Sequence, residues 1–190
     1  MLNVARNEHF YEAAEGHPSC VLVFHGANNP EATAHHEAGH LAAMLILEIA
    51  VDHCTIVPDE ARLGHTQWSA GQSVKIHDQL IAIYAGPIAE ARFLNDPIVA
   101  AINFYSVVDG DRQMIEAASE ALLNGNPAKS LMEIQVHVEM DAQRLVHEFA
   151  AALIDELASF LLKKLKLTGA EAIEVYSKFI EVEGKLQRIS

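Results

Sequence analysis

The sequence predicts a mainly α-helical fold with a small β element, and three observations support this. Apolar residues recur with the 3.6-residue period of a helix along several stretches, whereas alternating, β-branched segments are short and few. Hydrophobic residues form 51% of the chain and aromatic residues only 6%, so we expect a sizeable core of aliphatic side chains. The expected helices cover residues 34–49, 75–94, 111–123, 128–166 (continuous or interrupted) and 168–182.

The β element is expected where residues 51–57 and 64–68 flank a polar bend. Two short extended segments on either side of a turn are typical of a hairpin or small sheet. Residues 20–24 (CVLVF) form another short apolar run that fits a strand. Within residues 75–94, Gly86-Pro87 predicts a kink or a new helical start. Residues 98–108 are apolar without a period and give no prediction.

Charge and composition exclude several classes of function. A net charge of −13 argues against a nucleic acid or an anionic membrane as partner. The N-terminal residues do not resemble a secretory signal, and the apolar run from Leu41 to Leu47 is too short to span a membrane. Two cysteines, Cys20 and Cys54, are too few for a disulfide framework. We therefore expect a cytoplasmic protein with reduced cysteines.

The segment that carries chemistry is an H-E-x-x-H sequence formed by His36, Glu37 and His40. Residues four apart lie on one face of a helix, so both imidazoles can bind a single ion. Glu37 can then face a water molecule bound to that ion and act as general base and acid. Thr33 is the expected N-cap of this helix. The pattern is typical of a zinc-dependent hydrolase.

The competing interpretation is an acidic, histidine-rich helix whose histidines are packed or solvated. With 11 histidines in 190 residues, chance alone would produce the motif in roughly one chain in twenty. Two features favour the metal site. The stripe of His36 and His40 continues into Met44 and Leu47, which indicates a buried face, and Gly39 permits close approach of another element.

Several ordered segments together resemble the peptidase domain of the FtsH-type (AAA) ATP-dependent zinc metalloproteases, here without the ATPase module. The similarity covers roughly residues 34–180 and is more specific in its first half. The segments are HEAGH at 36–40, TIVP at 55–58 followed by LGHT at 63–66, AGPIAE at 85–90 and the acidic SVVDGD at 106–111.

This resemblance implies a helical, zincin-like metallopeptidase domain over residues 31–190, preceded by an N-terminal extension over residues 1–30. It also implies Zn²⁺ as cofactor and hydrolysis of internal peptide bonds in a polypeptide substrate. The strand near residues 64–68 would offer an open edge for pairing with that substrate or serve as a plain structural hairpin.

The third metal ligand has five candidates, of which Asp111 fits best. Counting from Asp111 puts Ile115, Ala118 and Leu122 on one helical face, and a first-turn carboxylate suits the helix dipole. The resemblance also places a zinc-binding aspartate in this segment, and Asp109 is the reserve. The other candidates are Glu90, which under the resemblance is an orienting or structural acid, and His137 and His147, which we expect to face solvent. His35 is expected to be exposed, and His65 and His77 to be solvated or packed.

These observations lead to a zinc-dependent metalloendopeptidase that stands alone as a relative of ATP-dependent proteases. No G-x-x-x-x-G-K-[ST] sequence occurs in the chain, so ATP-dependent activity is not carried over to it. A separate ATPase partner and a homo-oligomer both remain open. The alternatives are a zinc-stabilised, non-catalytic binding or assembly module, and a hydrolase of small-molecule amides that uses the same residues.

Overall fold

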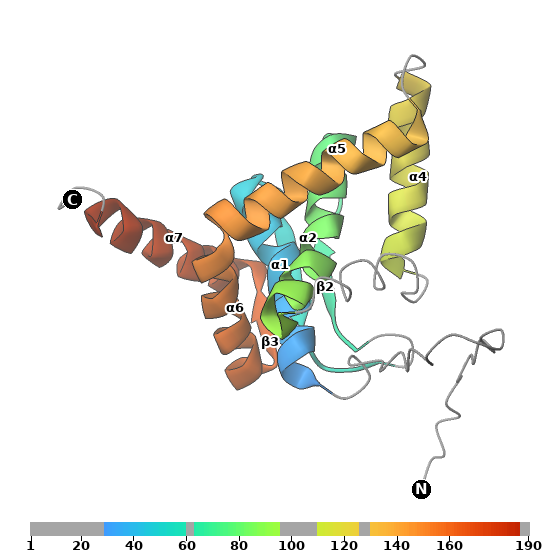
Figure 1. Cartoon of the computed structure of the whole chain (residues 1–190). Helices are drawn as coiled ribbons and strands as arrows, with labels where there is room; N and C mark the ends of the chain where they lie inside the picture. Colours follow the sequence, from blue (N-terminus) through green and yellow to red (C-terminus); the bar gives the residue numbers. More distant parts are fainter. Residues whose placement is uncertain (1–28, 60–62, 96–109, 126–129, 187–190) are drawn as a thin grey trace, which may run out of the picture.

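The computed structural model describes residues 29–59, 63–95, 110–125 and 130–186 (Figure 1). The expected strand at residues 20–24, Cys20, residues 98–108 and Asp109 lie outside these ranges. The described elements confirm a mainly α fold with a small antiparallel sheet. They are α1 (Pro30–Ile46), β1 (Val51–Thr55), β2 (His65–Trp68), α2 (Ile76–Leu94), α4 (Gly110–Gly125), α5 (Leu131–Arg144), the π-helical turn η1 (Leu145–Phe149), α6 (Ala151–Lys164), β3 (Lys166–Thr168) and α7 (Gly169–Leu186).

Helix α1 lies at the centre of the molecule and packs against both α2 and α6 (Figure 1). Its small residues let the neighbouring helices approach closely, as Ala34, Ala38 and Ala42 are all fully buried. A Cβ atom on Gly39 would lie 2.5 Å from the carbonyl oxygen of Ala85 in α2, closer than packed atoms approach. Gly39 therefore permits the contact between α1 and α2, as its sequence position predicts.

The start of α1 differs from the prediction. The N-cap is Asn29, whose side chain accepts hydrogen bonds from the backbone N–H groups of Glu31 and Ala32. Thr33, the predicted cap, lies inside the helix and donates its hydroxyl to the carbonyl of Asn29. The physical reason is Pro30, whose fixed φ and missing N–H suit the first helical position, so the residue before it caps the helix.

The sheet has the strand order β2-β1-β3, and both pairs are antiparallel. The pairing of β1 with β2 confirms the predicted hairpin. The prediction missed β3, because the helical pattern was extended to residue 166. Leu165 adopts a left-handed conformation with φ 65°, which ends α6, and its carbonyl accepts the N–H of Ile56 beside β1. A strand of three residues is too short to show alternation in a sequence.

The long stretch predicted as one helix, continuous or interrupted, consists of α5, η1 and α6. Ser130 caps α5 with a reciprocal pair of hydrogen bonds to Glu133. Figure 1 shows α5 meeting α4 at one end, and α7 extending from the body toward the C-terminus. Helix α2 continues through Pro87, so no new helix begins there.

In the part of the chain that the structure describes, no helix has both the length and the apolar character needed to cross a membrane.

Candidate metal centre

Helix α1 brings two imidazoles together. The Nε2 atoms of His36 and His40 lie 3.1 Å apart, and the ring centroids lie 4.8 Å apart with planes inclined by 78°. The spacing of four residues places both rings on one face of the helix, as the motif predicts. Both Nε2 atoms thus converge on one point in space.

Residues of α2 form hydrogen bonds with the other ring nitrogen, Nδ1, of both His36 and His40. The Nδ1 atom of His36 lies 2.9 Å from Oε2 of Glu90, and the Nδ1 atom of His40 lies 2.8 Å from the carbonyl oxygen of Ala82. A carbonyl oxygen or carboxylate accepts hydrogen bonds, so each Nδ1 is the protonated nitrogen of its ring. Hydrogen-bonded carboxylates and carbonyls behind the ring are typical of metal-ligating histidines, because they fix the tautomer and the ring orientation.

This tautomer leaves a lone pair on each Nε2, and the two lone pairs face each other. Two such atoms repel unless a proton or a cation lies between them. Zinc–nitrogen bonds of about 2.0–2.1 Å at a tetrahedral centre separate two nitrogens by about 3.3 Å, close to the spacing found here. The donor set therefore fits a zinc ion held by His36 and His40.

Gly86 in α2 makes room for the second ring. A Cβ atom at this position would overlap Nε2 and the neighbouring ring carbons of His40. No other residue could occupy this position without displacing the imidazole. The sequence prediction gave Gly86 only a kink or a new helical start together with Pro87, and it assigned no role to the carbonyl of Ala82. Only the AGPIAE segment at 85–90 pointed to this region.

Glu37 lies buried between α1 and the sheet, with 5% of its surface exposed. Thr66 in β2 donates its hydroxyl to Oε2 of Glu37 at 2.8 Å. Gly64 lies against the same carboxylate, because a Cβ there would be 3.0 Å from Oε1. One oxygen of Glu37 is thus held by Thr66, and the other lies beside a residue that has no side chain.

Cys54 in β1 lies beneath the motif and is fully buried. Burial, reinforced by the negative charge of Glu37, raises the pKa of its thiol well above the usual range. Its Sγ lies 3.8 Å from the backbone carbonyl of Glu37. This cysteine is therefore a neutral packing residue and supplies no thiolate for metal binding.

Of the third predicted ligand, Asp111, only the backbone lies within the described part of the chain. Helix α4 begins at Gly110, so Asp111 lies in its first turn, while its side chain and all of Asp109 lie outside the described residues. Among the side chains that are described, no group of three His, Cys, Asp or Glu is arranged to hold a metal ion. Glu90 contacts Nδ1 of His36, on the side of the ring opposite the converging atoms.

The remaining histidines considered from the sequence lie elsewhere. The prediction that His35 is exposed is wrong: its ring stacks on Phe93 with centroids 4.0 Å apart, and 12% of its side chain is exposed. Its Nδ1 donates to the carbonyl of Glu31 at 2.8 Å, which turns the ring toward α2. His137 and His147 are exposed on α5 and η1, as predicted.

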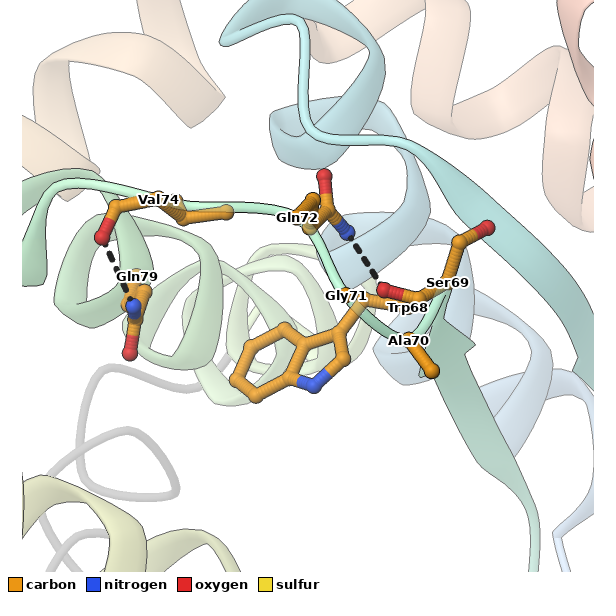
Figure 2. A pocket seen from close by; sticks show the side chains of 7 residues that line it. All are labelled: Trp68, Ser69, Ala70, Gly71, Gln72, Val74 and Gln79. Carbon is orange, nitrogen blue, oxygen red and sulfur yellow. Dashed lines mark hydrogen bonds between the residues drawn. The ribbon is translucent and has the colours of Figure 1, made fainter.

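A small pocket lies where β2 ends and the chain turns toward α2 (Figure 2). Figure 2 shows the indole of Trp68 as one wall, with Gln72 donating to the carbonyl of Ser69 and Gln79 to that of Val74. Gln72 also pairs with both backbone groups of Ala50, which anchors this turn to the start of β1. Trp68 packs partly against the core, as expected of a hairpin anchor.

Comparison with known proteins adds one similarity. No family model matches the sequence. The chain is 32% identical over 101 residues to an ATP-dependent zinc metalloprotease FtsH from Protochlamydia amoebophila (strain UWE25). The aligned region is 49% of this chain and 10% of that protein, so the chain spans about a tenth of the length of its relative. Over about half its length, the chain is thus similar to a protein named as a zinc metalloprotease.

Proposed function

We propose that this protein is a zinc-dependent metalloendopeptidase that hydrolyses peptide bonds in a polypeptide substrate. His36 and His40 hold the zinc ion, Asp111 completes its protein ligands, and Glu37 is the catalytic base and acid. The observation that carries the proposal is the convergence of two Nε2 lone pairs, each backed by an acceptor on Nδ1, beside the buried carboxylate of Glu37.

Zinc, when bound by these residues, would lower the pKa of a water molecule to roughly 7 and would polarise a carbonyl. Glu37 accepts a proton from the attacking water and delivers it to the leaving amine. Thr66 holds Oε2 of Glu37, so Oε1, next to Gly64, is the oxygen left to move the proton. Ala82 and Glu90 keep the two imidazoles in the tautomer that binds metal.

The sheet supports the choice of an extended polypeptide as substrate. In the described sheet β2 is an edge strand, and it carries Thr66, which contacts Glu37 directly. An extended peptide that adds to this edge would lie along the strand that holds the catalytic carboxylate. The pocket beside Trp68 lies at the end of the same strand, where it would receive one side chain of that peptide.

We expect this chain to cleave unstructured substrates without ATP. Hydrolysis of folded proteins would require a separate unfolding ATPase, and a homo-oligomer of this chain would then present several centres to it. The separate ATPase and the homo-oligomer are both part of the proposal.

The decisive variant is Glu37→Gln, assayed for cleavage of casein or an unstructured peptide with and without chelator. The amide keeps the shape of the side chain but cannot take the proton, so turnover should fall by about 10²–10⁴-fold while zinc content stays unchanged. His40→Ala should lose both zinc and activity, because it removes one of the ligands.

The matched control is Glu156→Gln, the same change at an exposed position on α6, which should keep full activity. Retained turnover in Glu37→Gln would overturn the mechanism. A chain that binds one zinc at this centre but cleaves neither substrate would instead favour a non-catalytic, zinc-stabilised binding module.

A further inference from the structure

A second pair of imidazoles lies on the sheet. His53 in β1 and His65 in β2 face each other with Nε2 atoms 3.0 Å apart. Their ring centroids are 5.0 Å apart and the planes are inclined by 80°. These values nearly repeat those of His36 and His40, although the two pairs are built from different elements. The chain therefore forms the same bis-imidazole geometry twice.

Strand register explains how these two rings meet. His53 is opposite Gln67, and Thr55 is opposite His65, so the two histidines are diagonal neighbours on one face. The intervening residues, Cys54 and Thr66, project to the other face, where they contact Glu37. The second pair and the catalytic carboxylate thus lie on opposite faces of the same two strands.

An irregularity in β1 supplies an orienting carboxylate. The register shifts between Val51 and His53, which leaves Asp52 as an extra residue in the strand. Neighbouring residues of a regular strand point to opposite faces, but a bulge can turn two of them to the same side. Oδ2 of Asp52 lies 2.7 Å from Nδ1 of His53.

This contact fixes the tautomer of His53. The carboxylate accepts the proton of Nδ1, so the lone pair of His53 lies on Nε2 and points at the ring of His65. A carboxylate behind a ligating histidine is the arrangement that raises metal affinity. The side chain of His53 is 20% exposed, which lets an ion reach the pair from solvent.

We propose that His53 and His65 form a second metal site, separate from the HExxH centre and selective for divalent ions that prefer imidazole. Zn²⁺, Ni²⁺ and Cu²⁺ belong to this class, and Cu²⁺ should bind most tightly. Two protein ligands leave the remaining positions to water, so the site is open and its ion exchanges readily. A bound ion would join β2 to β1 and so hold Thr66 against Glu37.

The site is tested in a chain that carries His36→Ala and His40→Ala, so that the outcome does not depend on the proposed peptidase centre. Titration with Ni²⁺ or Cu²⁺ alone, followed by calorimetry and metal analysis, should show one ion bound per chain. Adding His53→Ala or His65→Ala should abolish this binding. Asp52→Asn should weaken it by about 10–100-fold, because the orienting carboxylate is lost.

The matched control is His137→Ala, which removes an exposed histidine on α5 and should leave binding unchanged. Equal binding in the His53→Ala and His137→Ala chains would overturn the proposal. If the background chain does not fold, the same variants in the intact protein decide the question, since His53→Ala should lower the metal content by one ion and His137→Ala should not. If only the HExxH centre fails to bind metal, the His53→Ala and His137→Ala chains will still differ by one bound ion.

Discussion

At the scale of single residues, the backbone of α2 fixes the ring of His40. The carbonyl of Ala82 accepts the Nδ1 proton, and Gly86 leaves the space that the ring fills. Helix propensity and packing make opposite demands at Gly86. Alanine would favour the helix by about 0.5–1 kcal/mol, but its Cβ would overlap the ring of His40. Packing should prevail, because the overlap involves a buried ring held on its other side.

We therefore expect Gly86→Ala to lower both zinc affinity and thermal stability, with a loss of about 1–3 kcal/mol from overpacking. Competition with a chromophoric chelator measures the affinity, and thermal unfolding measures the stability. Gly184→Ala, at a glycine near the end of α7, is the control and should not reduce zinc affinity. A Gly86→Ala chain that binds zinc as tightly as the parent would show that His40 does not need this space.

Residue identities along the sequence were enough to predict that the rings of His36 and His40 meet on one face of α1, because a helix repeats every 3.6 residues and brings positions four apart together. They were not enough to select Thr66 as the partner of Glu37. That contact joins residues separated by 29 positions, and it depends on how the hairpin packs on α1. The incorrect N-cap has a local cause, since Asn29-Pro30 is a stronger helix start than Thr33.

At the scale of elements, a capping box begins α7, and Lys164 connects it to the end of α6. Glu171 accepts the N–H and the hydroxyl of Thr168, and Nζ of Lys164 donates to its other oxygen at 2.7 Å. The hydrogen bond from Lys164, followed by those from Thr168, lowers the pKa of Glu171 to about 2. The sequence pattern T-x-x-E at residues 168–171 is typical of such a cap, because both partners lie within four residues of each other.

The depressed pKa gives the cap a defined pH dependence. A carboxylate whose pKa is lower in the folded chain stabilises the fold above its unfolded pKa, and the effect is lost as pH falls through the folded pKa. Glu171→Gln should therefore lower Tm by a few degrees at neutral pH. The difference from the parent should shrink below about pH 4.5 and vanish near pH 2.

Thermal unfolding between pH 2 and 7 measures this difference. Glu181→Gln, the same change at an exposed site on α7, is the control. Parallel curves for the two variants across this range would exclude a specific role for the cap.

Helices α2, α4 and α7 were predicted within a few residues, because each contains several turns of periodic apolar residues. Strand β3 and the π-helical turn η1 were not predicted. Each involves five residues or fewer, and their conformations depend on contacts with β1 and with the ends of α5 and α6. Short elements carry too few residues for a period to be detected.

At the scale of the whole molecule, a zinc ion bound by His36, His40 and Asp111 would join α1 to α4. Helix α4 otherwise packs against α2 and α5 near one end of the molecule (Figure 1). A ligand present at 100 times its Kd stabilises the folded state by about 2.7 kcal/mol. Metal removal should therefore release this stabilisation.

We expect a chelator to lower Tm by about 5–10 °C, measured by calorimetry in a His53→Ala chain so that only the HExxH centre contributes. Asp111→Asn should lack this shift and contain little zinc. If Asp109→Asn removes the shift and Asp111→Asn keeps it, Asp109 is the third ligand. A Tm of the His53→Ala chain that does not respond to chelator would contradict the proposal that zinc joins α1 to α4.

The order of residues was sufficient for the helical class, the hairpin and the HExxH face, because these depend on interactions within one helix or one short turn. The tertiary structure alone showed which groups surround that face: Glu90 and Ala82 behind the imidazoles, and Thr66 and Gly64 beside Glu37. It also brought His53 and His65 together across two strands. Such contacts join distant positions through packing and register, and no local pattern encodes them.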